Sequence, residues 1–274
     1  MSERQAQVDT ASGLAQIVIE EPDGAPSFLV ALTHGAGGGV DAPDLLAVRD
    51  AALRLGGVVA RITQPYRVRG ARAPGSVARQ DAAWVEVITA LRALPLASPD
   101  EPVPTSSGGP LLSGSGGPLP AGSGGPLPAG SGEPLARRRD GLLPRGGEGA
   151  LPLVQGGRSN GARVACRTAA AVDAVAVIAL AFPLRPPGRP ERSRAAELRI
   201  PGRKLLIVSG DRDPFGVPGR RAGARVVVLS GETHALSRRP AEVGRAVAAW
   251  LPRALDLPRA PRRDGARKSA RPAG

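Results

Sequence analysis

The chain has 274 residues, of which 42% are hydrophobic but only 2% are aromatic, so its core must be built from aliphatic side chains and alanine. The formal net charge of +13 comes almost wholly from arginine, and no nucleic-acid-binding motif or set of stacking aromatic residues accompanies it. We therefore interpret the charge as a solvated basic surface and do not expect a nucleic-acid partner.

The single cysteine, Cys166, excludes an intramolecular disulfide and fits a reducing compartment, and its expected role is that of a small buried core residue. The first ten residues contain no apolar segment of the kind found in secretion signals. The longest apolar run, at 174–183, is too short to span a membrane. These features predict a cytoplasmic protein with no membrane partner.

Taken in chain order, residues 1–14 are expected to form a loose N-terminus, residues 64–66 a loop and residues 67–75 a basic loop. The other segments follow the periodicities of strands or helices. The expected strands are 15–20, 28–33, 58–62, 151–154, 174–182, 204–209 and 224–229. The expected helices are 44–55, 76–94, 162–170, 192–198 (short) and 240–251. Their alternation predicts an α/β fold, with a mostly parallel central sheet and helices on both faces.

A low-complexity segment interrupts this pattern at 97–149. It contains four eight-residue repeats, SGGPLLSG, SGGPLPAG, SGGPLPAG and SGEPLARR. Such a composition cannot bury enough apolar surface to offset the entropy of ordering, so we expect a disordered insertion. The predicted folded domain is therefore 15–252 with this insertion, followed by a disordered basic tail at 253–274.

The segment LPLVQGGRSNGAR, at 151–163, contains the pattern G-x-S-x-G centred on Ser159. Read as strand, tight turn and helix, this pattern exposes a serine hydroxyl at the edge of a sheet. With 37 glycines in the chain, the pattern alone is weak. It gains weight from residues elsewhere in the chain.

An acid and a histidine follow Ser159 in the order of a Ser-acid-His triad. Asp213 and His234 each come just after an expected strand, as Ser159 does, so all three are expected at the same edge of the sheet. The serine would need His234 as a base, and His234 would need an acid to orient it. Asp211 is the rival acid, and we prefer Asp213 because Pro214 follows it and fixes the chain leaving the site.

The sequence HGAGG at 34–38 is the natural oxyanion loop. A backbone N–H of Ala36 or Gly37 would act together with the N–H of Asn160, the residue after the serine. His34, one of only two histidines, is expected to hold this loop rather than to take part in catalysis.

Two charged residues near the motifs are expected to be structural. Glu232 is expected to be a solvated turn residue. Arg158 is expected to point away from the serine and to form a salt bridge with the scaffold.

The chain resembles a small α/β-hydrolase, and within that superfamily it is similar to the bacterial proteins grouped with testis-expressed protein 30 and subunit three of the NSL complex. The residues that carry the resemblance are THGAGGG (33–39), GGRSNGAR (156–163), AFPLRPPGRPERSR (181–194), GDRDPFG (210–216) and GETHAL (231–236). The resemblance implies a triad of Ser159, Asp213 and His234, and no cofactor. It also favours Asp213 over Asp211.

The sequence therefore predicts a serine hydrolase that cleaves an ester, thioester or amide of a small molecule. The segment 183–203 is too short for a cap domain, so we expect an open site, and Arg185, Arg189 and Arg192 are candidates for contacts with anionic substrates. The alternative is a catalytically silent hydrolase-fold scaffold for protein interaction.

Overall fold

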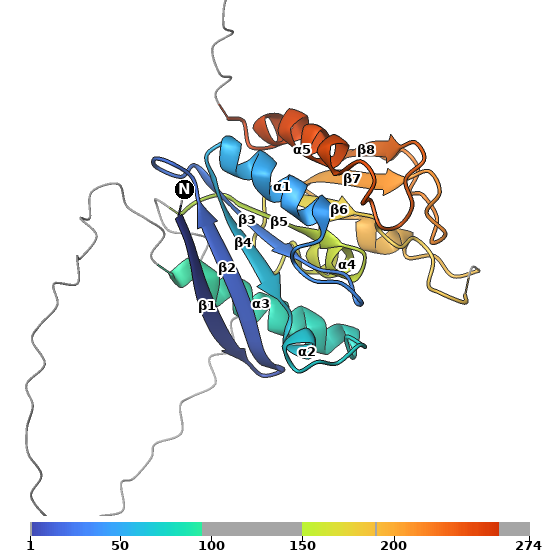
Figure 1. Cartoon of the computed structure of the whole chain (residues 1–274). Coiled ribbons are helices and arrows are strands. Elements are labelled where there is room, and N and C mark those ends of the chain that lie inside the picture. Colours follow the sequence, from blue (N-terminus) through green and yellow to red (C-terminus); the bar gives the residue numbers. More distant parts are fainter. Residues whose placement is uncertain (1, 95–149, 190, 258–274) are drawn as a thin grey trace, which may run out of the picture.

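The computed structural model describes residues 2–94, 150–189 and 191–257 as an eight-stranded sheet with helices on both faces (Figure 1). The expected insertion at 97–149 and residues 258–274 of the expected basic tail lie outside the described residues, as do residues 1, 95–96 and 190. In sheet order, the strands are β1 (Ser2–Thr10), β2 (Gly13–Glu21), β4 (Gly57–Thr63), β3 (Phe28–Thr33), β5 (Leu153–Arg158), β6 (Ala176–Leu180), β7 (Lys204–Gly210) and β8 (Ala224–Leu229). The helices are α1 (Pro43–Arg54), α2 (Pro65–Val68), α3 (Val77–Ala93), α4 (Asn160–Thr168), the 3₁₀ helix η1 (Ala195–Leu198) and α5 (Pro240–Ala254).

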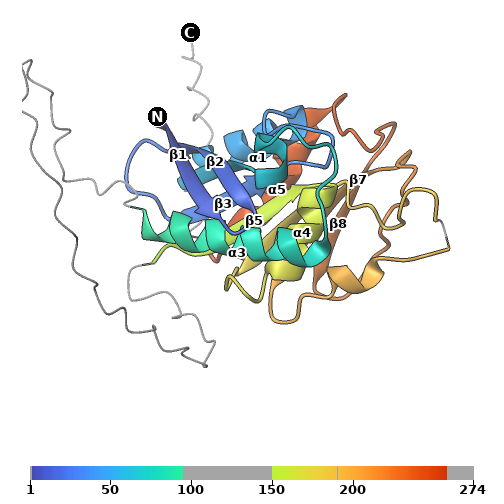
Figure 2. The ribbon, with the colours of Figure 1, turned by 90° about the horizontal axis from the view of Figure 1, so that it is seen from below.

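The sheet is parallel from β4 to β8, whereas β1 and β2 join it antiparallel. Helices α1 and α5 cover one face, and α3 and α4 cover the other (Figures 1 and 2). This is the mostly parallel α/β architecture that the sequence predicted.

Strand β3 shows why the central strands are apolar along their whole length. Phe28, Val30 and Leu32 contribute to the core under α1 and α5, while Leu29 and Ala31 contribute to the core under α3 and α4. A strand covered on both faces has no solvated side, so its pattern is continuous rather than alternating.

The N-terminus is not loose as expected, because residues 2–10 form β1. The strand pairs antiparallel with β2 from Ser2 opposite Glu21 to Thr10 opposite Gly13. Its side chains are half-buried or exposed, and Ala6 and Val8 pack against the core. Backbone pairing with β2 stabilises a segment whose polar sequence carries little strand signal of its own.

Several further boundaries differ from expectation, among them β5, which was expected at 151–154 and is observed at Leu153–Arg158. Residues 65–68, expected within a loop, form the short helix α2. Helix α5 extends to Ala254, past the expected end at residue 251, with Pro252 inside it.

The point where the insertion joins the described chain and the serine lie at opposite ends of β5. Residues 150–152 lead into the amino end of β5, and Ser159 follows its carboxyl end. The central position of β5, between β3 and β6, places Ser159 at the middle of the sheet edge.

Candidate active site

Three of the residues predicted from the sequence converge at the carboxyl edge of the sheet. Ser159 follows β5, Asp213 follows β7 and His234 follows β8. His234 Nε2 lies 2.8 Å from Ser159 Oγ, and His234 Nδ1 lies 2.8 Å from Asp213 Oδ2. Because an ionised carboxylate can only accept, Nδ1–H donates to Asp213 and Nε2 is left to accept the serine hydroxyl proton. The arrangement can therefore move a proton from the serine to the imidazole.

Ser159 lies in a strained turn between β5 and α4. Its φ of 54° and ψ of −110° lie in a region that residues with a side chain rarely adopt. Its N–H donates to Leu180 O of β6 at 2.9 Å, and its carbonyl accepts from Arg163 N of α4 at 3.2 Å. These bonds hold the turn from both sides and leave the hydroxyl at a cavity.

The two glycines of the motif are required by close packing. A Cβ on Gly157 would lie 2.6 Å from Thr33 O and 2.8 Å from the carbonyl carbon of Gly161. A Cβ on Gly161 would lie 2.6 Å from Thr33 O and 2.7 Å from His34 O. Only glycine lets the serine turn lie directly against the end of β3.

The surroundings of Asp213 and Asp211 separate the two rival acids. The Asp213 side chain is fully buried, and its Oδ1 accepts from Phe215 N at 2.9 Å while Oδ2 faces the histidine. The Phe215 ring packs edge-to-face on His234, with centroids 4.6 Å apart. Asp211 is exposed, and its Oδ1 accepts from Gly231 N at 2.8 Å, so it links two loops. Asp213 is therefore the acid that contacts His234.

His34 holds the glycine-rich loop, in agreement with its expected structural role. Gln64 N donates to His34 Nε2 at 3.1 Å, so the proton lies on Nδ1, which is 2.8 Å from Gly35 O. Burial lowers the pKa of His34, so the ring stays neutral. The Tyr66 hydroxyl also donates to Gly35 O, at 3.4 Å.

The fixed carbonyl of Gly35 determines where the next N–H points. In a trans peptide the N–H lies opposite the C=O, so the Ala36 N–H points away from His34 and Tyr66. Ala36 and Gly37 both line the same cavity as Ser159. The loop can therefore present an N–H to an oxygen bound beside the serine.

Asn160, the first residue of α4, lines that cavity as well. Its buried side chain points elsewhere, because Nδ2 donates to Gln80 Oε1 at 2.7 Å. Gln80 in turn donates to Gly75 O at 3.0 Å. The side chain thus ties α4 to the start of α3 and leaves the Asn160 backbone N–H for the site.

Arg158 forms the expected scaffold contact but also reaches the site. Its Nε lies 3.4 Å from Oδ2 of Asp44, which is fully buried at the start of α1. Its NH2 group donates to His234 O at 3.2 Å. Burial raises the pKa of Asp44 to about 6, and the charge of Arg158 opposes that rise. The pair joins α1, the end of β5 and the histidine loop.

Glu232 is not the solvated turn residue that the sequence suggested, because it is only 1% exposed. Its Oε1 accepts the N–H of Arg239, the residue that caps α5, and its carbonyl accepts from Arg212 N at 2.9 Å. A carboxylate near a helix N-terminus is stabilised by the free N–H groups there. Glu232 therefore ties both loops of the site to α5.

Ser159 and His234 open onto a cavity of about 610 Å³. Its wall includes the loop at 35–38, two prolines of the segment after β6, and Arg158, Arg163 and Arg194. Arg185, Arg189 and Arg192, the candidates from the sequence, are exposed and do not line it. Arg163 and Arg194 end the motifs at 156–163 and 181–194, but the sequence did not single them out, because the packing of η1 against α4 is what brings them together.

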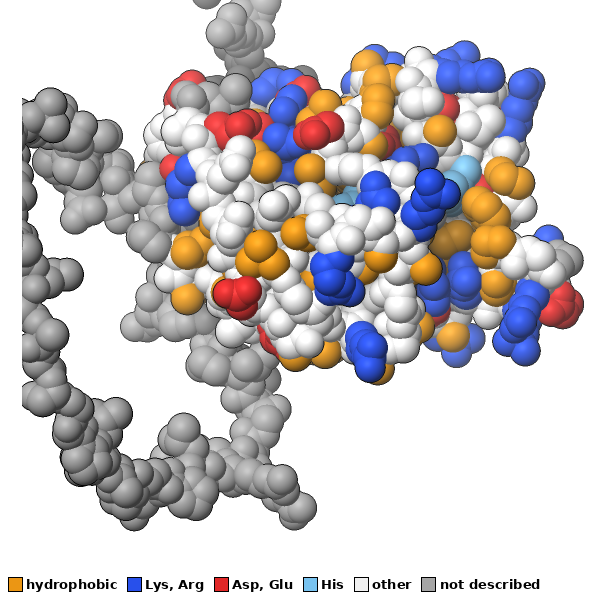
Figure 3. All heavy atoms as spheres, turned by 60° about the horizontal axis from the view of Figure 1, so that its bottom comes forward, with side chains coloured by type: hydrophobic (Ala, Val, Ile, Leu, Met, Phe, Trp, Pro, Cys, Tyr) orange, Lys and Arg blue, Asp and Glu red, His pale blue; other side chains and the backbone are white. Residues whose placement is uncertain are grey.

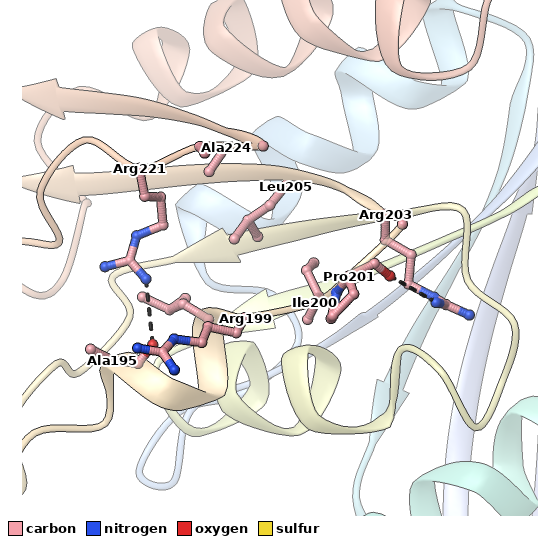
Figure 4. A pocket seen from close by; sticks show the side chains of 12 residues that line it. Ala195, Arg199, Ile200, Pro201, Arg203, Leu205, Arg221 and Ala224 are labelled. Carbon is pink, nitrogen blue, oxygen red and sulfur yellow. Dashed lines mark hydrogen bonds between the residues drawn. The ribbon is translucent and has the colours of Figure 1, made fainter.

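A second cavity, of about 480 Å³, lies at the amino ends of β7 and β8 beside η1 (Figure 4). Two of its arginines bond to backbone carbonyls: Arg221 NH1 donates to Ala195 O at 3.4 Å, and Arg203 NH1 donates to Pro201 O at 3.1 Å. None of the three converging residues lines it, so it is separate from the candidate active site.

Within the described residues, no cluster of three or more His, Cys, Asp or Glu side chains is arranged to hold a metal ion. In the same part of the chain, every helix is too short or too polar to cross a membrane.

Two comparisons with known proteins, one by sequence and one by structure, agree with the α/β fold described above for this chain. Residues 139–237 match a family model described as an alpha/beta hydrolase domain. None of the curated proteins compared with the chain matches it in sequence.

Solved structures match over nearly the whole chain at low identity. XC6422 from Xanthomonas campestris, described as an a/b serine hydrolase without lid, is 17% identical with a TM-score of 0.61, and the match covers 95% of this chain and 98% of that one. Est1E from Butyrivibrio proteoclasticus is 14% identical with a TM-score of 0.59, covering 92% and 99%. An alpha-beta serine hydrolase homologue from Coxiella burnetii is 17% identical with a TM-score of 0.58, covering 92% and 98%. The protein therefore has the α/β-hydrolase fold, and its residues 139–237 carry the sequence pattern of an alpha/beta hydrolase domain.

Proposed function

We propose that the protein is a serine hydrolase that cleaves an ester, thioester or amide of a small molecule, with Ser159 as nucleophile, His234 as general base and Asp213 as the orienting acid. The observation that carries this proposal is the continuous contact from Ser159 Oγ through His234 to Asp213, with both distances 2.8 Å. A nucleophile, base and acid in this order are the parts that acyl transfer needs.

In the acylation step, His234 Nε2 takes the hydroxyl proton as Ser159 Oγ attacks the substrate carbonyl carbon. The tetrahedral intermediate then collapses, and the imidazolium returns that proton to the departing alcohol, thiol or amine. Water repeats the sequence on the acyl-enzyme and releases the acid. Asp213 stabilises the imidazolium throughout, and its buried bond to Phe215 N keeps the carboxylate aimed at Nδ1.

The N–H groups of Asn160 and of Ala36 or Gly37 would hold the oxyanion. Two features support this assignment: His34 and Tyr66 fix the Gly35 carbonyl, and Ala36, Gly37 and Asn160 line one cavity with Ser159. Donors fixed in advance stabilise the charge without reorganising as it forms.

Three finer points belong to the same proposal. The likeness to the bacterial proteins grouped with testis-expressed protein 30 and NSL complex subunit three is supported by the motifs at 33–39, 156–163, 181–194, 210–216 and 231–236. Serine hydrolases and esterases among the similar folds support a small-molecule substrate. A cytoplasmic location agrees with the single reduced cysteine.

A fluorophosphonate probe tests the proposal directly. We expect covalent labelling of the wild-type protein and none of Ser159→Ala. The matched control is Ser193→Ala, which removes an exposed hydroxyl on the segment after β6 and should label like wild type. Hydrolysis of short 4-nitrophenyl esters should be lost with the labelling.

Labelling that persists in Ser159→Ala would overturn the assignment of the nucleophile. A folded wild-type protein that neither labels nor hydrolyses any ester would favour the alternative, a silent hydrolase-fold scaffold for protein interaction.

A further inference from the structure

The candidate active-site cavity is lined by cations without a lining anion. Arg158, Arg163 and Arg194 contribute to its wall, and none of the described lining residues is Asp or Glu. On the face shown in Figure 3, blue Lys and Arg side chains lie around the visible pale-blue histidine atoms. The cavity thus combines the nucleophile with an unbalanced positive charge.

Two of these arginines are neutralised within the protein. Arg158 pairs with the buried Asp44 at 3.4 Å. Arg163 forms a two-bond pair with Glu197, its Nε at 2.9 Å from Oε2 and its NH2 group at 2.7 Å from Oε1. Their charges are already matched and their guanidinium groups are held in place.

Arg194 differs, because no carboxylate of the described residues lies within ion-pair distance of it. Its guanidinium makes a long bond to Pro183 O at 3.4 Å, and its backbone N–H donates to Leu184 O at 2.8 Å. Partial burial, and then the charge of Arg163, lower the pKa of Arg194, and the more distant charge of Glu197 offsets only part of this effect. A bound anion would relieve that situation.

The neighbouring carboxylates cannot supply this anion, because they are already shared. Glu197 pairs with Arg163 and also with Arg167, at 3.2 Å. Arg167 also pairs with Asp81, and its NH2 group lies 2.7 Å from Asp81 Oδ1. The guanidinium groups of Arg163, Arg167 and Arg194 carry three positive charges, and the two neighbouring carboxylates carry two negative charges. One positive charge is therefore left for the cavity.

We propose that Arg194 binds a carboxylate carried by the substrate, so that the preferred substrates of this site are esters or thioesters with a free carboxylate group. The planar guanidinium suits a carboxylate because it can offer two parallel N–H donors. Segment 183–203 would then act as the specificity wall of an otherwise open site. This inference rests on the proposed hydrolase function.

The first test compares matched esters. The first substrate pair is 4-nitrophenyl glutarate, which has a free carboxylate, and the neutral ester 4-nitrophenyl valerate. The measured quantity is the ratio of their kcat/KM values, glutarate over valerate. A second ratio uses 4-acetoxybenzoate and phenyl acetate, so that a carboxylate on the leaving group is also covered. In Arg194→Gln we expect at least one ratio to fall about 10- to 100-fold, the loss typical of one charge-assisted contact. Arg194→Lys should restore part of it, and Arg192→Gln, which removes an exposed arginine two residues away, should keep both ratios.

The second test measures binding in a variant that lacks the nucleophile. Monomethyl glutarate should bind the Ser159→Ala protein more tightly than Ser159→Ala/Arg194→Gln by a similar factor, measured by titration calorimetry at low salt. Ratios unchanged in Arg194→Gln, in an enzyme that labels at Ser159, would overturn the inference and leave the proposed function standing. If no ester is cleaved, equal binding by the two Ser159→Ala proteins would overturn it independently.

Discussion

Asp211 and Asp213 lie two residues apart, yet their contacts give them different roles. Asp213 is buried between Phe215 N and the His234 ring, while Asp211 is exposed and accepts from Gly231 N. An acid can orient a histidine only if its own position is fixed and the histidine lies within reach. At this scale, backbone N–H groups decide which carboxylate points into the site.

Replacing each of these aspartates in turn tests the distinction. Asp213→Asn should lower kcat for ester hydrolysis by about 10⁴-fold, because the amide no longer stabilises the imidazolium and favours the wrong tautomer. Asp211→Asn serves as the matched control and should keep most of the activity. Steady-state kinetics on a 4-nitrophenyl ester measure both, and circular dichroism checks that the variants fold. Comparable losses in the two variants would contradict the assignment of Asp213.

Single residues also show how far the sequence could be interpreted. Ser159, Asp213 and His234 were predictable because each lies shortly after the carboxyl end of a strand, and strand ends in a parallel sheet meet at one edge. Arg194 and the burial of Glu232 were not, since both depend on contacts between loops whose paths carry no periodic signal. Pattern analysis finds positions fixed by regular elements and misses those fixed by loop packing.

At the scale of elements, the site depends on the joint between β5, α1 and the loop before α5. Arg158 at the end of β5 contacts Asp44 of α1 and His234 O of the loop. Asp44 is fully buried, so its charge is costly even beside an arginine. This joint should therefore respond to pH.

The change Asp44→Asn should alter how stability depends on pH. Burial raises the pKa of Asp44 from 3.8 to about 6 in the folded protein. The folded state then holds the proton more tightly than the unfolded one, so this contribution is complete below about pH 4 and is lost as pH rises through about 6. The stability of wild type relative to Asp44→Asn should fall across this range by at most about 3 kcal/mol.

Urea unfolding of both proteins at several pH values between about 4 and 7.5 measures this difference. Asp50→Asn, which removes a partly exposed carboxylate from the same helix, is the control for loss of an acidic side chain from α1. A constant difference between wild type and Asp44→Asn, or the same trend in Asp50→Asn, would refute the explanation.

The sequence pattern predicts some strands and helices better than others. The strand at 28–33 was predicted with the bounds of β3, because burial on both faces makes a run of apolar side chains. Strand β1 was missed because its sequence, SERQAQVDT, is polar and its order comes from pairing with β2. Arg61 is buried inside β4, where Glu20 and Asp41 provide its counter-charges. A strand that is ordered by pairing with its neighbour has no local sequence signature, and neither has a buried cluster of ion pairs.

At the scale of the whole molecule, the parallel sheet brings distant segments to a single edge. Ser159 and His234 are 75 residues apart in sequence, and the loop at 35–38 precedes the serine by more than 120 residues, yet all line one cavity. Their geometry therefore depends on the sheet remaining intact. A probe of the core reports on the site as well.

Cys166 offers such a probe, because it is the only cysteine of the chain and lies on α4 with its side chain buried in the core. Burial raises the pKa of its thiol to about 12, and only the thiolate reacts with disulfide reagents. The native protein at pH 8 should therefore react with 5,5′-dithiobis(2-nitrobenzoate) far more slowly than the protein in guanidinium chloride, which should release one equivalent of thiolate product. At intermediate denaturant, the labelling rate should rise in parallel with the loss of helical circular dichroism, since α4 opens together with the core that covers it. Rapid labelling of the native protein, or labelling that precedes the loss of helical signal, would show that α4 opens separately from the sheet, and Ser159 at its start would then not be held by the core as a whole.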